Sequence, residues 1–193
     1  MSEPAQAVPL MDPAAEQIQR TITNLINDGG WDTPPGVILF HRDPDDDKVA
    51  IAIGMLAVPE DAFQYAVRRF IDGELEKSRD VYAIAMDMEF WHLPYNDPTP
   101  EQRAEAERLT EARMLDTHPE RQERRVIICM DADDRVYVAV LTRGAEAPEM
   151  FWGRRDADGI DAKLRKLAPP ELTQLVQAHA TRIQRAWLER LLD

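Results

Sequence analysis

The sequence predicts an α+β fold in which a five-stranded, largely antiparallel sheet is covered by helices. Two pairs of β-rich segments are each separated by a short polar stretch, as in β-hairpins. A fifth segment, residues 81–93, alternates with a period of two. Segments with helical spacing of apolar residues precede, separate and follow these strands. Because hairpins force antiparallel neighbours, we expect the order α-β-β-α-β-α-β-β-α-α.

The first helix is predicted to begin at Asp12. An Asp side chain at this position can accept hydrogen bonds from free backbone amides, and Pro13 occupies a helix position whose amide would be unpaired anyway. The glycines at 29–30 provide a stop. Segments 37–40 and 49–58 then form the first hairpin. Since both are apolar on both faces, we expect strands that are covered on both sides or that lie in the centre of the sheet.

A second helix begins near Pro59, and residues 81–93 follow as the clearest strand. We expect Tyr82 to share one face with the even-numbered residues after it, and Val81 to share the other with the odd-numbered ones. That second face changes from apolar to acidic at Asp87. This end of the strand is therefore predicted to reach solvent or a cleft.

A charge-rich helix follows, for which Thr99 and Gln102 form a predicted capping box. Its few apolar residues indicate an exposed helix. Segments 126–130 and 136–141 then make a second hairpin. The turn between them, residues 131–134, is rich in Asp, which tolerates backbone angles that most residues avoid.

The rest of the chain is predicted to be helical after an irregular stretch over residues 144–158. A short helix is expected over residues 160–167, and Pro170 opens a final helix with a broad apolar stripe. The order of elements resembles that of profilin-like or roadblock-like domains. This resemblance lies in topology alone, is carried by no motif, and implies no particular function.

Length and composition predict one folded domain. The chain has 193 residues, of which 44% are hydrophobic and 31% charged, values typical of a single globular unit. The first residues lack any apolar periodicity. We therefore predict a disordered or loosely attached tail over residues 1–11 and a single α+β domain over residues 12–193.

Charge and cysteine content limit the partners and the compartment. Lys and Arg total 23 against 36 Asp and Glu, a formal charge of −13, so we predict no direct binding to nucleic acid. Two alternatives stay open: a local basic face, and an acidic surface that imitates DNA. No apolar run approaches the ~20 residues of a membrane helix, and no secretory signal is found. With the single Cys129, these features predict a cytoplasmic protein that does not enter a membrane.

The strongest chemical candidates lie at the acidic end of the strand over residues 81–93. Asp87 and Glu89 are two residues apart on one face, roughly 6–7 Å between Cα atoms, and could hold a divalent cation or divide acid and base roles. His92 is close in sequence but should point to the opposite face from Glu89. If the two acids are merely solvated, replacing both by alanine should change stability little. The candidates for a cleft or ligand site are Asp87, Glu89, Trp91, His92 and His41.

Two apolar features are candidates for an interface. The run 150–152 is either packed over the sheet or offered to a partner, and the stripe on the final helix could extend into a homodimer seam. The interface candidates are Phe151, Trp152, Ile183 and Trp187.

No motif assigns a catalytic residue, a metal ligand or a cofactor. Residues 41–43 match the catalytic-loop tripeptide of protein kinases, but the other kinase motifs are missing. The Asp-rich segments lack the ligand spacing of calcium loops. Cys129 lies in an apolar strand, where cysteine acts as a small hydrophobic residue.

These observations favour a non-enzymatic protein-interaction or regulatory domain with an acidic surface, which binds a protein partner or self-associates. One alternative is a small-molecule binding or sensor module with a pocket lined by Met86, Met88, Phe90 and Trp91. The second alternative is an enzyme with a site built from Asp87, Glu89 and His92.

Overall fold

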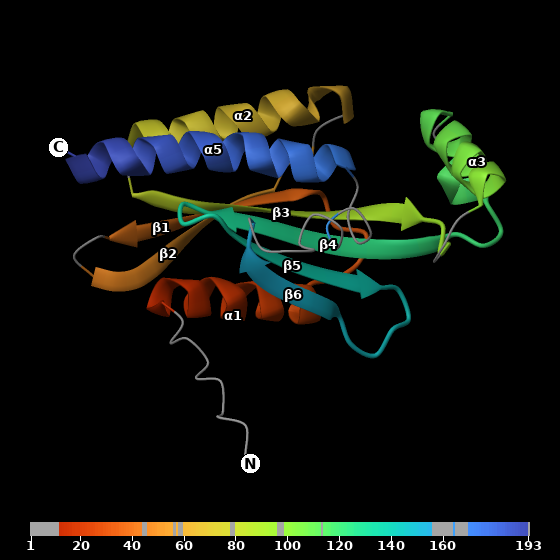
Figure 1. Cartoon of the computed structure of the whole chain (residues 1–193), viewed down its shortest axis with the longest axis horizontal. Coiled ribbons are helices and arrows are strands. Elements are labelled where there is room, and N and C mark those ends of the chain that lie inside the picture. Colours follow the sequence, from red (N-terminus) through yellow and green to blue (C-terminus); the bar gives the residue numbers. More distant parts are fainter. Residues whose placement is uncertain are drawn as a thin grey trace, which may run out of the picture.

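Figure 1 shows the computed structural model, in which one sheet lies between two layers of helices. Helix α1 covers one face of the sheet, and α2 and α5 lie side by side on the other. The fold is α+β with an antiparallel sheet, as predicted from the sequence. The structure describes residues 12–43, 46–55, 57, 60–77, 80–95, 99–112, 114–155, 164 and 170–192.

The sheet has six strands in the order β2-β1-β3-β4-β5-β6, and every neighbouring pair is antiparallel. Strand β3 is therefore central, while β2 and β6 are the two edges. The elements are α1 (Pro13–Asp28), β1 (Gly36–Asp43), β2 (Asp46–Met55), α2 (Glu60–Lys77), β3 (Val81–His92), α3 (Pro100–Glu111), the 3₁₀ helix η1 (Leu115–Thr117), β4 (Gln122–Asp131), β5 (Arg135–Thr142), β6 (Glu149–Arg154) and α5 (Pro170–Leu192).

The predicted count of five strands is wrong, because β6 lies within the stretch expected to be irregular. Its apolar residues are consecutive and show no period of two: Met150 packs against the core under α1, and Phe151 against the core on the other face. Pairing with β5 makes this segment a strand, a contact that its own sequence does not encode. The predicted tail and the short helix over residues 160–167 lie outside the described residues, except Leu164.

Two cores hold the layers together. On one face, α2 and α5 pack on the large aliphatic residues of the strands, such as Ile84 and Ile128. On the other, Ile18, Ile22 and Ile26 of α1 share a core with large strand residues, such as Phe40 and Ile127, and with smaller ones. Each fully buried isoleucine contributes roughly 1.5–3 kcal/mol relative to exposure, so the spacing of four residues fixes which side of α1 faces the sheet. Those smaller residues are Ala83, Ala85, Cys129 and Ala139.

Helix α1 begins as the sequence predicts, with Asp12 Oδ1 accepting a hydrogen bond from the Ala14 amide at 3.1 Å. It ends before Gly29, whose φ of −72° is available to any residue. The reason for glycine here is a close approach: a Cβ at this position would lie 1.8 Å from Arg125 Nη1. The backbone at the end of α1 thus packs directly against the side chain of Arg125 in β4.

A β-bulge at Tyr82 changes the predicted faces of β3. In the β1–β3 register Phe40 pairs with Ala83, but His41 pairs with Val81, so Tyr82 is an extra residue. Val81 therefore enters the core under α2 and α5, while Tyr82 joins the core of α1. The expected assignment of these two residues to faces is wrong for this reason.

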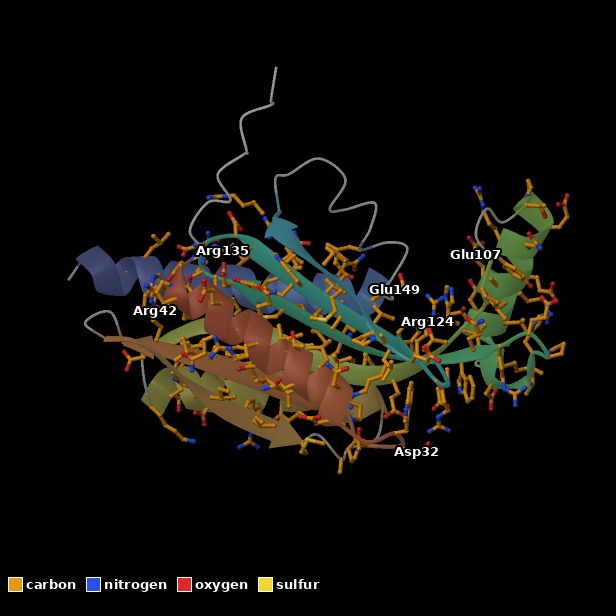
Figure 2. The ribbon with its side chains drawn as sticks, turned by 90° about the horizontal axis from the view of Figure 1, so that it is seen from below. Asp32, Arg42, Glu107, Arg124, Arg135 and Glu149 are labelled. Carbon is orange, nitrogen blue, oxygen red and sulfur yellow. The ribbon has the colours of Figure 1, made fainter. Side chains whose placement is uncertain are left out.

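Strand β2 is an edge strand, which contradicts the expectation of cover on both sides. Its Ile51, Ile53 and Met55 side chains are 42%, 54% and 56% exposed. Figure 2 shows α1 crossing one face of the sheet diagonally, with β2 along the outer side of the helix.

Among the described helices, none is long and apolar enough to cross a membrane.

Candidate functional site

Asp87 forms a buried ion pair with Arg125 of β4. Arg125 Nε donates to Asp87 Oδ1 at 2.8 Å, and Arg125 Nη2 binds the other carboxylate oxygen. The two side chains are only 6% and 15% exposed, and the Asp87 carboxylate raises the pKa of Arg125. Arg125 Nη1 also donates to the Gly30 carbonyl at 3.2 Å. Asp87 is therefore a structural partner of Arg125, and the interpretation of it as a solvated acid is wrong.

Glu89 holds the loop that follows α1. Its carboxylate accepts hydrogen bonds from the amides of Asp32 at 2.9 Å and Thr33 at 3.3 Å. Carboxylate oxygens of Asp32, Glu89 and Glu123 lie within 4.8 Å of one another, as they would around a cation. However, Arg143 already binds Asp32 at 2.8 Å and Glu123 at 3.0 Å. Arg143 thus supplies positive charge that balances the negative charge of these carboxylates.

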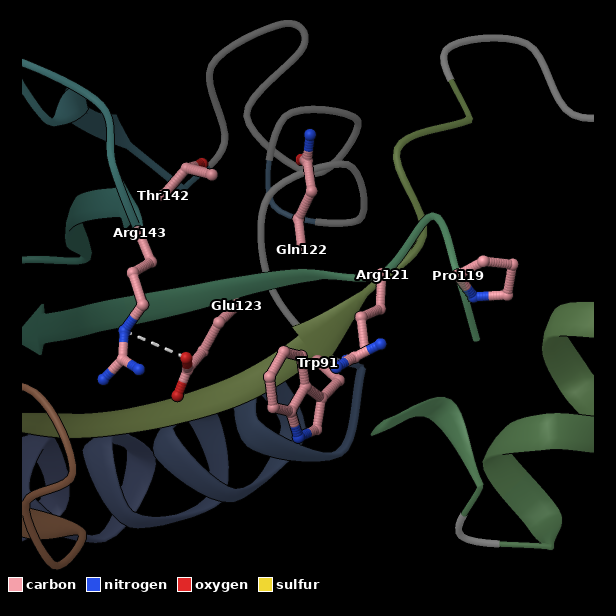
Figure 3. Close-up of a pocket in the computed structure, with 7 residues that line it drawn as sticks. All are labelled: Trp91, Pro119, Arg121, Gln122, Glu123, Thr142 and Arg143. Atoms are coloured by element: carbon pink, nitrogen blue, oxygen red, sulfur yellow. Dashed lines mark ion pairs between the residues drawn. The ribbon is translucent and has the colours of Figure 1, made fainter. Parts of the chain in front are cut away.

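A shallow depression of about 490 Å³ adjoins these acids (Figure 3). The Arg121 guanidinium lies over the Trp91 ring at 5.2 Å, and Arg143 lies over Trp31 at 4.8 Å. Of the five predicted cleft residues, Trp91 alone lines this depression. The lining residues are Trp91, Pro119, Arg121, Gln122, Glu123, Thr142 and Arg143.

Neither predicted histidine joins the acids, and the two histidines lie at opposite ends of β3. His92 ends β3 on the face opposite Glu89, where burial and then the charge of Arg124 lower its pKa to about 4. His41 pairs with Val81 at the other end of β3. Its Nε2 lies 3.9 Å from Glu74 Oε2, and burial lowers its pKa. The structure does not bring the predicted acid and base groups together.

The four predicted interface residues divide into two pairs. Ile183 and Trp187 are buried within the chain, and Trp187 meets the Tyr82 ring edge-on at 5.3 Å. The stripe on the final helix is thus used to pack α5 on the sheet. Phe151 is partly buried, whereas Trp152 on the edge strand β6 is 44% exposed.

Sequence reasoning missed a buried polar network at the β4–β5 turn. The Asp131 side chain is fully buried; its Oδ1 accepts from the amides of Asp133 and Arg135 at 2.9 Å, and its Oδ2 accepts from the Tyr137 hydroxyl at 2.9 Å. Burial raises the pKa of Asp131 to about 6. These bonds fix the turn, in which Asp134 has a φ of 59° as the Asp-rich sequence predicts.

The same network fastens the start of α1. Asp12 Oδ2 accepts from Arg42 at 3.1 Å and from Arg135 at 3.2 Å, and Figure 2 shows both arginines at this end of the sheet. The Tyr82 hydroxyl donates to Asp133 at 2.6 Å. Every one of these groups has a hydrogen-bond or ion-pair partner. The network is therefore best explained as stabilising the fold, not as a reactive site.

The edge of β2 differs, because part of its backbone faces outward. Arg42 donates its amide to the Asp80 carbonyl at 2.8 Å, away from β2. Opposite Arg42, Val49 directs its amide and its carbonyl to the side-chain amide of Gln17, at 3.3 and 2.8 Å. Arg42 and Val49 are therefore a non-hydrogen-bonded pair of the β1–β2 ladder.

Alternation along β2 then determines which other groups face outward. Ile51, Ile53 and Met55 have the same orientation as Val49, so their N–H and C=O groups point away from β1. Their exposed side chains form a row on the same stretch of chain. We call these three residues the β2 strip. The sequence signal was present, since large apolar residues alternate there with Ala50, Ala52 and Gly54, but it does not reveal that β2 is an edge.

Comparisons with protein-family models, with curated proteins and with solved structures find no match to this chain. The resemblance to profilin-like or roadblock-like domains therefore gains no support from solved structures.

Proposed function

We propose that this chain is a non-enzymatic protein-interaction domain that adds an extended segment of a partner protein to its β2 edge. One observation carries the proposal: the β2 strip combines exposed apolar side chains with outward-facing backbone groups. Natural proteins usually block such edges with charges, proline or a covering element. Strand addition to an exposed edge is a common way in which proteins bind peptides.

The strip offers both components of a strand-addition site. Ile51, Ile53 and Met55 each present one donor and one acceptor, and each hydrogen bond made there contributes roughly 0.5–1.5 kcal/mol net. Their side chains add apolar surface, worth roughly 25 cal/mol per Å² removed from water. An added strand would cover both at once.

Hydrogen exchange at individual amides tests the proposal. The probe is a set of short synthetic peptides in which valine alternates with lysine, threonine or glutamate. We expect at least one peptide to slow the exchange of the Ile51 and Ile53 amides, which face outward. The amides of Ala52 and Gly54 face β1 and serve as internal controls whose exchange is already slow.

A charge placed in the strip should abolish this effect. Ile53→Lys introduces the residue that natural edges use against strand addition, so peptide binding should be lost. Leu188→Lys is the matched control, since Leu188 is 53% exposed on α5 and should leave binding unchanged. If no peptide protects the strip amides of the wild-type protein, the proposed function is wrong.

A small-molecule binding module is the second candidate, and the depression in Figure 3 favours it. Arg121 and Trp91 there present a cation and an aromatic ring on one wall. Native mass spectrometry of the purified protein would detect a retained small molecule. Retention that is lost in Arg121→Ala would support this candidate, and a clean apo mass would count against it.

A further inference from the structure

We infer that the partner segment at the β2 edge is basic, and that Gln17 sets how far along β2 it can extend. The inference rests on the proposed function, because it concerns the occupant of the same edge. It follows from the net charge of the chain, from the two faces of β2, and from the hydrogen bonds of Gln17.

The negative charge of the chain favours a basic partner segment. Helix α1, which packs on β2, carries two acidic residues and one basic residue. The whole chain has a formal charge of −13. A basic segment is attracted to this surface, whereas a second copy of the chain brings the same charge and is repelled.

The two faces of β2 indicate where the basic side chains lie. On the α1 face, the strip presents large apolar residues, which favour apolar cross-strand partners. On the α2 face, the same strand presents Ala50, Ala52 and Gly54, and Phe70 of α2 packs over Gly54. Glu74 of α2 lies beside His41, which pairs with Ala50. Lys77 of α2 also binds Glu74, at 2.6 Å. An added strand with alternating apolar and basic residues places its apolar side chains on the face of the strip and its basic side chains on the α2 face.

Gln17 limits the length of this strand. Its side-chain amide binds the Val49 carbonyl and amide at 2.8 and 3.3 Å, in the way that a neighbouring strand would. Val49 itself is buried. A partner strand can therefore bind the backbone from Ile51 to Met55, but it reaches Val49 only by displacing Gln17.

The three peptides of the exchange experiment also test the charge preference, by fluorescence anisotropy. We expect the valine–lysine peptide to bind about tenfold more tightly than the valine–threonine peptide at low salt, and the valine–glutamate peptide to bind most weakly. The advantage of lysine should shrink at ~0.5 M salt because the charges are screened. Equal affinity for all three peptides would overturn the basic partner while leaving the proposed function in place.

Self-association is the remaining alternative occupant. Protection of the strip amides that grows with protein concentration, without peptide, would identify a second copy and also overturn the basic partner. Failure of every peptide, with no such growth, would instead contradict strand addition itself.

The role of Gln17 has its own measurement. In Gln17→Ala, a lengthened valine–lysine peptide should newly protect the Val49 amide, and it should bind more tightly than to wild type. The Ala50 and Ala52 amides, which face β1, report whether the variant keeps the β1–β2 ladder. An unchanged peptide footprint in a folded Gln17→Ala protein would show that Gln17 does not limit the strand.

Discussion

Asp87 on β3 and Arg125 on β4 meet diagonally across the sheet. In the strand register Asp87 lies opposite Ile127, and Arg125 lies opposite Glu89, yet the Asp87 carboxylate receives two nitrogens of Arg125. The third nitrogen of the guanidinium group reaches the Gly30 carbonyl. One ion pair therefore joins two central strands to the end of α1.

Asp87→Ala should lower the free energy of unfolding by about 3 kcal/mol, since it leaves a buried guanidinium without its carboxylate. Urea unfolding followed by tryptophan fluorescence measures this change. Asp32→Asn is the control, because asparagine tolerates the φ of 63° at this position. The ion pair of Asp32 with Arg143 involves a carboxylate that is 77% exposed, and such pairs contribute only ~0–1 kcal/mol. Equal effects of the two substitutions would contradict the structural role of Asp87.

Gly29→Ala should destabilise the protein by roughly 1–3 kcal/mol, as overpacking does. The added Cβ would lie 1.8 Å from Arg125 Nη1, so the guanidinium group would have to move away from Asp87. Gly30→Ala is the matched neighbour, since its nearest contact would be 3.9 Å away. Thermal unfolding of both variants should therefore show a loss for Gly29→Ala alone, and a similar loss in both would argue against the close approach.

Asp131 should make the protein less stable as the pH rises. Its pKa is about 6 in the folded protein against about 3.9 in an unfolded chain, so the folded state binds the proton more tightly. The favourable contribution is fully present below about pH 4 and is lost as the pH rises through 6.

Asp131→Asn removes this titration. The difference in free energy of unfolding between the variant and wild type should shift by about 3 kcal/mol in favour of the variant from pH 3 to pH 8. Urea unfolding across that range measures it. A difference that does not vary with pH would contradict the raised pKa.

His92 should show the opposite dependence. Its folded pKa of about 4 lies below the unfolded value of ~6.5, so its contribution is present above pH 6.5 and is lost as the pH falls through 4. NMR titration of the His92 ring protons should give a midpoint near 4. Arg124→Gln should raise that midpoint, because the arginine charge is the second cause of the shift; an unchanged midpoint would assign the shift to burial alone.

Local features of this fold could be predicted from the sequence because their causes lie within a few residues. The Asp12 cap, the Thr99–Gln102 capping box and the left-handed residue in the turn at 131–134 are all present. Each depends on side chains that bond to nearby backbone, which a short segment specifies by itself.

Features that depend on strand order could not be predicted in this way. An apolar strand such as β2 has the same pattern at the centre of a sheet and at an exposed edge. The bulge at Tyr82 is set by the register with β1, and β6 forms through its pairing with β5. The ion pair of Asp87 likewise requires Arg125, which is 38 residues away.

Helix α3 stands away from the sheet (Figure 1), and Leu109 is the one described residue of this helix that is buried. Its remaining side chains carry little of the packing that holds the strands in place. This helix is therefore a natural point for inserting an affinity tag or a fluorescent reporter, which would label the protein while leaving both edges of the sheet unobstructed.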